Sequence, residues 1–256
     1  MFSDEELTCD AFLDGKVHLF QPRNGYRAGV DPVLLAACVN AKPGQSVLEL
    51  GCGAGAASLC LSARVPELHL TGLERQPAYA ALARRNALAN HTEMTVFEAD
   101  LAAVPAEVRQ MRFDNVIANP PYFKRESSTA ARDHGREGAL GEDTPLEVWV
   151  KVAAKRLLPK GYLHFIHRAE RLPDLLAACS GRLGSIEVLP LVPRHNRPAE
   201  LVVLRARSTG RAAFRLHTPL VLHDGENHGS DEEDYTPLVR SVLRDGAAIP
   251  FGASQL

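Results

Sequence analysis

The sequence lacks any long apolar run and any excess of charge of one sign. No stretch approaches the roughly 20 consecutive apolar residues that cross a bilayer, so we do not expect this chain to be a membrane protein. Its 29 basic and 31 acidic residues give a formal net charge of -2, so binding to nucleic acid would have to rest on a local patch. The acidic first residues, MFSDEELTCD, lack the basic start and apolar core of a secretory signal, which favours a cytoplasmic location.

Pairs of metal-ligating or disulfide-forming residues are also missing. The five cysteines are an odd number and include no C-x-x-C pair, which argues against a disulfide framework and against a zinc site. Histidines such as His134, His195 and His223 have no spacing that would pair them on one face of an element. We therefore expect no metal ion and interpret the cysteines as small core residues.

Seven apolar runs of strand length alternate with helical patterns from residue 46 onward. Their continuous apolar character is typical of strands covered on both faces. No helical pattern separates the last two runs, so these should pair antiparallel. The pattern predicts a Rossmann-like, doubly wound α/β sheet of seven strands, with ligands at the carboxyl ends of the strands. The predicted strands are 46–50, 68–73, 94–98, 113–118, 162–167, 185–192 and 200–206.

Prolines at a first helical position mark the predicted helix starts. They occur at Asp31-Pro32, Gln76-Pro77, Thr144-Pro145 and Thr236-Pro237. Thr144 and Glu147 also have the spacing of a capping box, which predicts a helix through Trp149 to Leu158. The sequence Pro159-Lys160-Gly161 should end this helix.

The first 30 residues differ from the rest of the chain. In KVHLFQPRNGYRAG, an Asn24-Gly25 turn between extended segments predicts a hairpin ahead of the sheet. We therefore expect a hairpin flap over residues 1–30 and one α/β domain over residues 31–256.

A glycine-rich stretch follows the first predicted strand. Gly51, Gly53 and Gly55 in VLELGCGAG lie between this strand and a helical pattern. Glycine lets the backbone approach a ligand closely, and the start of a helix offers unpaired N–H groups, so we interpret the three glycines as cofactor-binding residues. The stretch GCGAGA also satisfies the G-x-G-x-x-A form of a dinucleotide fingerprint, and a tight turn without a ligand is the simplest alternative.

Acidic residues end the next two predicted strands. Glu74 lies at about the ~20-residue distance at which a carboxylate binds ribose hydroxyls, a feature that serves NAD and S-adenosylmethionine equally. Asp100 follows the third strand, where it could accept a hydrogen bond from an adenine amino group. Either acid could instead cap a helix.

The motif Asn119-Pro120-Pro121-Tyr122 follows the fourth predicted strand, and so should lie beside the same crevice. Proline fixes φ and removes an N–H donor, so this turn presents acceptors in a stiff frame. The Asn119 side-chain oxygen and the Pro120 carbonyl could bind both N–H groups of an exocyclic amine, and Tyr122 could stack on its base. The alternative is a proline-rich turn that only ends a strand. Hydride transfer has no use for such a clamp, which disfavours a dehydrogenase.

Together these residues resemble class I S-adenosylmethionine-dependent methyltransferases that modify amino nitrogens through an NPPY motif. The chain looks most like the bacterial tRNA adenosine N6-methyltransferases, which modify the adenosine beside the anticodon of a valine tRNA. The likeness is carried by the segments 21–37, 48–55, 119–123 and 157–168. It implies a class I methyltransferase domain over residues 31–256, S-adenosylmethionine as cofactor and tRNA as substrate.

The resemblance also implies roles for two residues outside the strand-end pattern. In the family, the segment matching residues 21–31 folds over the methionine end of the cofactor, so Arg27 is a candidate for binding its carboxylate; a surface arginine is the alternative. Glu49, just before the glycines, matches an acidic residue that meets the same end of the cofactor.

A long polar segment over residues 124–144 follows the NPPY motif and departs from the family pattern. It is rich in Gly, Ser and Arg and is too long for a plain connection, which suggests a lid or a binding segment. We predict that Arg125, Arg132 and Arg136 contact RNA phosphates, although an ordinary solvated loop fits the composition as well.

Two other functions remain open at this point. A protein methyltransferase that acts on glutamine is the first, because its planar amide resembles the adenine amine and such enzymes share the NPPY motif. These enzymes usually carry a helical substrate domain ahead of the sheet, whereas only 45 residues precede the first strand here. The second is a catalytically silent scaffold that binds RNA or cofactor.

Overall fold

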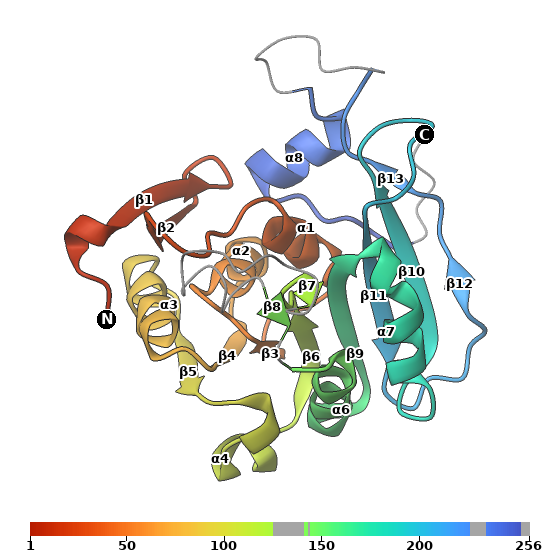
Figure 1. The fold of residues 1–256 in the computed structure, drawn as a ribbon, viewed down its shortest axis with the longest axis horizontal. Coiled ribbons are helices and arrows are strands. Elements are labelled where there is room, and N and C mark those ends of the chain that lie inside the picture. The colour runs from red at the N-terminus through yellow and green to blue at the C-terminus, as the bar shows by residue number, and fades with distance from the viewer. Residues whose placement is uncertain (125–140, 143, 226–233, 252–256) are drawn as a thin grey trace.

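A computed structural model describes residues 1–124, 141–142, 144–225 and 234–251. Its centre is a sheet of nine strands that runs from β5 at one edge to β12 at the other (Figure 1). Along the path the order is β12-β10-β11-β9-β6-β3-β4-β5, and β13 also pairs with β10. All seven predicted strands belong to this sheet, and the two additional strands are short pieces beside β10.

The seven predicted strands form a mainly parallel sheet. Their bounds are β3 Ser46–Leu50, β4 His69–Glu74, β5 Met94–Glu98, β6 Phe113–Ala118, β9 Leu157–Arg168, β10 Gly184–Val192 and β11 Leu201–Arg207, and the short strands are β12 Arg215–Leu216 and β13 Leu220–Val221. β11 lies antiparallel to both β9 and β10, which confirms the predicted antiparallel closure. The chain runs outward from β3 through β4 to β5 and then returns to the other side of β3 with β6. This reversal creates a switch point between β3 and β6, where doubly wound sheets bind ligands.

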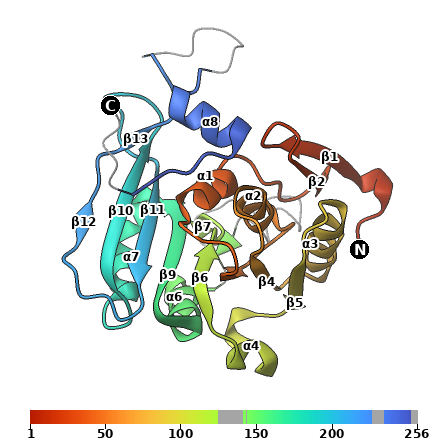
Figure 2. The same ribbon diagram turned by 180° about the vertical axis from the view of Figure 1, so that it is seen from behind.

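Helices cover both faces of the sheet (Figures 1 and 2). Side chains of α1, α2, α3 and α8 share one apolar core, and those of α4, α6 and α7 share the other. Neighbouring residues of β3 illustrate the division, because Val47 joins the first core and Leu48 the second. The helix bounds are α1 Asp31–Cys38, α2 Ala56–Arg64, α3 Pro77–Ala89, α4 Ala106–Gln110, α6 Leu146–Arg156, α7 Leu172–Cys179 and α8 Pro237–Asp245.

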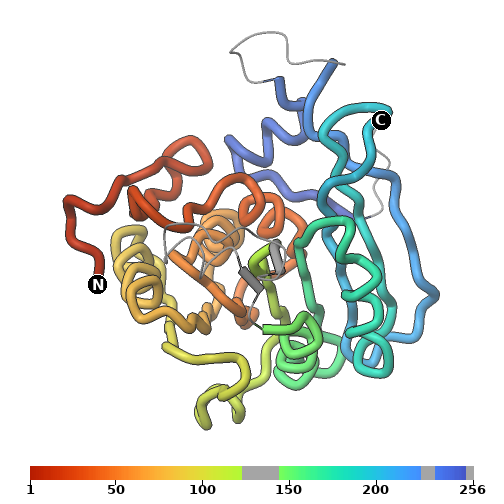
Figure 3. Tube along the Cα trace, in the orientation of Figure 1, coloured from red at the N-terminus to blue at the C-terminus, as the bar shows by residue number. Residues whose placement is uncertain are grey.

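The N-terminal hairpin exists, but its turn was wrongly predicted. β1 Leu7–Phe12 pairs antiparallel with β2 Val17–Pro22, with Phe12 opposite Val17. The turn is therefore Leu13 to Lys16, where Asp14 and Gly15 have φ of 54° and 83°. Asp-Gly supplies the left-handed backbone of a tight hairpin turn as readily as Asn-Gly. Asn24 and Gly25 instead lie in the connection from β2 to α1, and β2 lies beside α3 (Figure 3).

The helix predicted through Trp149 to Leu158 ends two residues earlier, at Arg156. Leu157 already pairs with Phe113 of β6, so Leu157 and Leu158 belong to strand β9 instead of the helix. Pro159-Lys160-Gly161 forms an irregularity within β9 rather than a helix stop, with Lys160 at φ 69°. The predicted capping box is also wrong, because the N-cap of α6 is Pro145 and no side chain caps it.

None of the helices in the described part of the chain is long and apolar enough to span a membrane. Within the same residues, no three His, Cys, Asp or Glu side chains gather as they would around a metal ion. The remaining elements are the short strands β7 Phe123–Lys124 and β8 Gly141–Glu142 and the 3-10 turns Asp4–Glu6, Leu101–Ala103 and Ala169–Arg171.

Candidate active site

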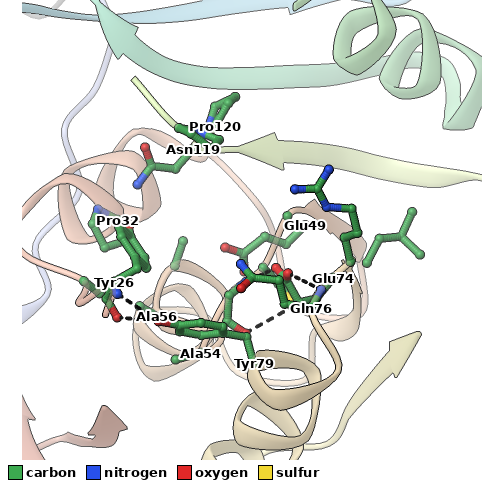
Figure 4. A pocket seen from close by; sticks show the side chains of 18 of the residues that line it. Tyr26, Pro32, Glu49, Ala54, Ala56, Glu74, Gln76, Tyr79, Asn119 and Pro120 are labelled. Carbon is green, nitrogen blue, oxygen red and sulfur yellow. Dashed lines mark hydrogen bonds between the residues drawn. The ribbon is translucent and has the colours of Figure 1, made fainter. Parts of the chain in front are cut away.

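A pocket opens at the carboxyl ends of β3, β4 and β6 and is closed on another side by the connection that follows β2 (Figure 4). Asn119 and Pro120 line one side of it, and Glu49, Glu74 and Tyr79 lie across from them. The walls include nine of the ten predicted site residues that the structure describes: Arg27, Glu49, Gly51, Gly53, Glu74, Asp100, Asn119, Pro120 and Tyr122. The parallel strands therefore bring distant parts of the sequence to one place.

The glycine loop, residues 51–55, turns sharply between β3 and α2. Gly51, Gly53 and Gly55 all have positive φ, at 63°, 52° and 86°. A Cβ on Gly53 would have only a ring carbon of Tyr26 nearby, at 3.8 Å, so a ligand can approach the backbone there. A Cβ on Gly51 would lie 2.6 Å from the Trp149 ring, so this glycine is required by packing. Gly55 is the N-cap of α2 and is the one predicted site residue of the described chain that does not line the pocket.

Glu74 holds the glycine loop from the end of β4. Its Oε2 accepts a hydrogen bond from the Gly53 N–H at 2.9 Å, and its Oε1 accepts one from the Gln76 N–H at 2.8 Å. Burial raises the pKa of Glu74, while these two N–H donors act in the opposite direction. The carboxylate lines the pocket and each oxygen has further acceptor capacity, as binding to two ribose hydroxyls requires.

Glu49 lies deeper, on the side of β3 that faces α2. Its Oε2 accepts hydrogen bonds from the Ser58 N–H at 3.0 Å and from the Ser58 hydroxyl at 2.5 Å. Ser58 is the third residue of α2, so Glu49 satisfies a free N–H at the start of this helix. Burial raises the pKa of Glu49 to about 7, because only 4% of the residue is exposed and the charged form loses its hydration. The two hydrogen bonds from Ser58 act in the opposite direction and lower the pKa.

Asp100 follows β5 and lines the pocket. Its Oδ1 accepts a hydrogen bond from the Ala102 N–H at 2.8 Å and caps the following 3-10 turn. The alternative interpretation as a cap is therefore correct, and Asp100 also lines the pocket. Binding of an adenine amino group by its carboxylate stays a prediction.

Asn119 and Pro120 leave β6 with the Asn119 side chain at the pocket wall (Figure 4). Asn119 is half-buried, and among the described residues its side-chain amide has no hydrogen-bond partner. An amide beside a pocket without a partner in the described protein is suited to binding a polar group of a ligand. Pro120 is buried and adds the fixed φ that orients this turn.

Tyr122 is held by partners far away in the sequence. Its hydroxyl donates a hydrogen bond to Asp31 Oδ2 at 2.5 Å. Its ring lies 5.4 Å from that of His167, and the Arg168 guanidinium lies 5.7 Å from the ring centre. Burial and the Asp31 carboxylate raise the pKa of Tyr122, so the phenol remains a donor. The ring lines the pocket in a fixed orientation, as a stacking surface requires.

Arg27 is engaged with the hairpin. Its guanidinium pairs with Asp10 at 2.5 Å and donates hydrogen bonds to the Thr8 hydroxyl and the Pro22 carbonyl, at 2.8 and 2.9 Å. It lines the pocket as well, so a role towards the carboxylate of the cofactor stays a prediction. The predicted substrate-binding residues Arg125, Arg132 and Arg136 lie outside the described residues.

Among the pocket residues that sequence reasoning did not assign to the site are Tyr26, Asp31, Tyr79 and Trp149. Asp31 was interpreted as a helix start and as the end of the segment 21–31, but its hydrogen bond with Tyr122 was not foreseen. Tyr26 adjoins Arg27 in a segment that the resemblance places over the cofactor, and this was the available signal. Nothing local to Tyr79 or Trp149 indicates the pocket, because both belong to helical patterns.

Comparisons with known proteins agree with this geometry. Residues 28–172 match the family model of the methyltransferase small domain, which is more than half of the chain. The chain belongs to this methyltransferase family. The predicted family, its α/β fold and its cofactor, S-adenosylmethionine, are thereby confirmed.

The chain is similar to curated proteins over most of their length. It is 32% identical to the tRNA1(Val) (adenine(37)-N6)-methyltransferase of Porphyromonas gingivalis over 88% of this chain and 92% of that protein. It is 27% identical to the protein of the same name from Actinobacillus succinogenes, over 85% and 91%.

Two solved structures share the fold. A predicted O-methyltransferase of Agrobacterium tumefaciens is 26% identical with a TM-score of 0.71, over 87% of this chain and all of that chain. The 16S rRNA N2-guanine methyltransferase of Thermus thermophilus, solved with S-adenosylmethionine and guanosine, is 20% identical with a TM-score of 0.56. This alignment covers 79% of this chain and 50% of that chain.

The residues of the pocket fit S-adenosylmethionine. The uncovered backbone at Gly53 leaves space for close approach, and Glu74 and Asp100 offer acceptors to ribose and adenine. Asp31 and Glu49 add carboxyl groups to the same walls, which favours a ligand that carries a sulfonium and an ammonium charge. When bound, the cofactor supplies an electrophilic methyl group.

We expect Glu74→Ala to weaken S-adenosylmethionine binding by about 1.5 to 3 kcal/mol, because it removes a buried, charge-assisted acceptor. Isothermal calorimetry on the purified protein measures this directly. Glu98→Ala is a matched control, since Glu98 pairs with Glu74 in the sheet register but is exposed and does not line the pocket. Unchanged affinity in Glu74→Ala, or a preference for NAD, would contradict the assignment.

Glu49 should make the stability of the protein depend on pH. Its folded-state pKa of about 7 lies above its ordinary value of 4.5, so the folded protein binds this proton more tightly than the unfolded chain. The contribution of Glu49 to stability is therefore greatest below pH 4.5 and is lost as the pH rises towards 7.

Urea unfolding at pH 5 and pH 8 tests this expectation. The wild-type protein should lose up to about 3 kcal/mol more than Glu49→Gln between these two values. Comparing the two proteins removes the contribution that His164 and His167 make to the pH dependence in both. Burial lowers the pKa values of these histidines to about 3 and about 4. The same pH dependence in both proteins would show that Glu49 does not titrate in this range.

Proposed function

We propose that this protein transfers a methyl group from S-adenosylmethionine to the exocyclic N6 amine of an adenosine in tRNA. The observation that carries the proposal is the side-chain amide of Asn119, which has no hydrogen-bond partner among the described residues and lines, with Pro120 and Tyr122, a pocket whose residues fit the cofactor. The two curated relatives bear the name of an adenine-N6 tRNA methyltransferase, and the chain spans more than nine tenths of each.

The Asn119 oxygen and the Pro120 carbonyl accept the two N–H groups of the target amine. The nitrogen lone pair is delocalised into the adenine ring, and these acceptors draw electron density back to the nitrogen. They also fix the amine in line with the methyl group, which lowers the entropic part of the barrier. Tyr122 supports the base from a ring whose position Asp31 fixes.

Transfer forms the new carbon–nitrogen bond while the carbon–sulfur bond breaks, and the nitrogen becomes cationic. The same two acceptors stabilise this charge until a proton leaves to solvent, so the reaction needs no general base beforehand. His167 is not placed to act as one. Its Nδ1 accepts a hydrogen bond from the Arg168 N–H at 2.8 Å, and this assigns the proton of the neutral ring to Nε2.

A glutamine side chain is the competing acceptor, because its amide would fit the same clamp. The structure has a two-stranded hairpin, a connection and one helix before β3. The names of the two curated relatives, both tRNA methyltransferases, support a nucleic acid substrate. A cytoplasmic location, where tRNA is modified, also stays a prediction.

The test is incubation with labelled S-adenosylmethionine and separate fractions of tRNA, ribosomal RNA, DNA and protein, followed by mapping of the modified nucleoside. The wild-type protein should produce N6-methyladenosine in tRNA. Asn119→Ala should lower the rate on the order of 100-fold or more, as loss of one preorganised polar group does, and keep its cofactor affinity.

Three outcomes would overturn the proposal. Label on a glutamine of the protein fraction would identify the competing substrate. Cofactor binding without transfer to any fraction would identify a silent scaffold. Transfer by Asn119→Ala at the parental rate would show that the clamp mechanism is wrong.

RNA binding by Arg125, Arg132 and Arg136 is part of the proposal. Replacing all three by Gln should leave cofactor affinity unchanged and lower the slope of log affinity against log salt by up to about 2 to 3, near one per lost phosphate contact. Filter binding of tRNA at several salt concentrations measures the slope.

The double variant Arg211→Gln/Arg215→Gln is the comparison for this measurement, because both residues are exposed at the far edge of the sheet. A slope that falls only in the double variant would place the RNA-binding surface at that edge instead.

A further inference from the structure

Three polar side chains of α3 and its C-cap contact the backbone of the N-terminal segment. They are Tyr79, Asn86 and Asn90, which are separated by two helical turns and then one, so they share one face of the helix. Each side chain both accepts from the N–H and donates to the carbonyl of one residue, through two amide atoms in the asparagines and through the single hydroxyl in Tyr79. Such contacts replace the backbone pairing that a neighbouring strand would provide.

Asn86 and Asn90 dock the hairpin along β2. Asn86 accepts from the Phe20 N–H at 2.8 Å and donates to the Phe20 carbonyl at 3.0 Å. Asn90 accepts from the His18 N–H at 2.8 Å and donates to the His18 carbonyl at 2.7 Å. His18 and Phe20 lie two residues apart, so α3 contacts one edge of the strand.

Asn86 and Asn90 differ in the partner of their third hydrogen bond, because Asn90 Nδ2 donates to the Asn86 carbonyl at 2.7 Å, within the end of the helix. Asn86 Nδ2 donates instead to the Ala54 carbonyl of the glycine loop at 2.9 Å. Asn86 is completely buried, and its amide uses both hydrogens and its oxygen in these three contacts. The side chain therefore joins the hairpin to the loop that lines the cofactor pocket.

Tyr79 holds the connection after the hairpin. Its hydroxyl accepts from the Tyr26 N–H at 2.8 Å and donates to the Tyr26 carbonyl at 3.1 Å. A Cβ on Gly25 would lie 2.9 Å from this hydroxyl, so glycine is needed there for the close approach. Tyr26 in turn lines the pocket, and its ring lies beside Gly53.

We propose that Asn86 and Tyr79 are positioning residues that hold the N-terminal segment and the glycine loop in the arrangement that binds S-adenosylmethionine. Asn86 acts through Ala54, and Tyr79 acts through Tyr26. The inference rests on the cofactor of the proposed function but not on its RNA substrate. It predicts that cofactor affinity depends on the contact that Asn86, which does not line the pocket, makes with the glycine loop, and on the hold of Tyr79 on Tyr26.

Asn86→Ala and Asn90→Ala form a matched pair for the test. Both lose a bidentate contact to β2, but only Asn86→Ala loses the contact to the glycine loop. We expect calorimetry to show S-adenosylmethionine affinity about 10-fold or more weaker in Asn86→Ala and within about threefold of wild type in Asn90→Ala. In the methylation assay, Asn86→Ala should raise KM for the cofactor and change kcat little, because the clamp for the amine is intact.

Hydrogen exchange provides a readout that does not depend on activity. In the wild-type protein, the cofactor should slow exchange in the glycine loop and in residues 20–26 together, and Asn86→Ala should lose the protection of residues 20–26. If the two alanine variants weaken cofactor binding equally, Asn86 only docks the hairpin, and its proposed role in positioning the glycine loop is wrong.

Tyr79→Phe tests the second positioning residue and covers the case in which Asn86→Ala does not fold. It keeps the ring, which packs edge-on against Phe2 at 5.4 Å, and removes only the hydroxyl. We expect cofactor affinity to fall about 5- to 10-fold and the Tyr26 amide to exchange faster.

Unchanged affinity in Tyr79→Phe would show that the position of Tyr26 does not matter. Calorimetry needs no RNA, so these results are independent of which acceptor is methylated. If Glu74→Ala weakens cofactor binding but Asn86→Ala and Tyr79→Phe do not, the cofactor assignment holds and this inference fails.

Discussion

The hydrogen bond from the Gly53 N–H to the Glu74 carboxylate is the contact on which the site depends. It joins the ends of two neighbouring parallel strands across a turn that only glycine adopts without strain. On its other side, the same loop is held by Asn86 through the Ala54 carbonyl. A loop fixed from both sides presents its backbone to a ligand without paying an ordering cost at binding.

Buried carboxyl groups next to this loop set its electrostatic character. Glu49 and Glu74 are buried, and each accepts hydrogen bonds from backbone N–H groups, with the Ser58 hydroxyl adding one to Glu49. Such groups cost free energy when they are ionised, which is why burial raises the pKa of both. A ligand with positive charge offsets part of that cost, and S-adenosylmethionine carries two positive groups.

The pocket has two walls of different origin. The sheet supplies one, through the glycine loop and Asn119, and the N-terminal segment supplies the other, through Tyr26 and Asp31. Hydrogen bonds from Tyr79 to Tyr26 and from Tyr122 to Asp31 tie the walls together. The reacting amine would therefore meet a methyl group in a space whose two sides are fixed by the same fold, as in-line transfer requires.

The sequence by itself determined the strands, the glycine loop, Glu74 and Asn119, because each is a local pattern at a strand end and parallel strands bring their carboxyl ends to one edge. It did not determine which groups these residues contact. Arg27 pairs with Asp10, and Tyr122 binds Asp31 across 91 positions of the chain. Asn86 looks like any polar residue of a helical pattern, yet it contacts Phe20 and Ala54, 66 and 32 positions away. Only tertiary packing decides such contacts, because hydrogen-bond partners that are distant in the chain leave no periodicity or spacing in the sequence. Burial then favours a fold in which each buried polar group has a hydrogen-bond partner.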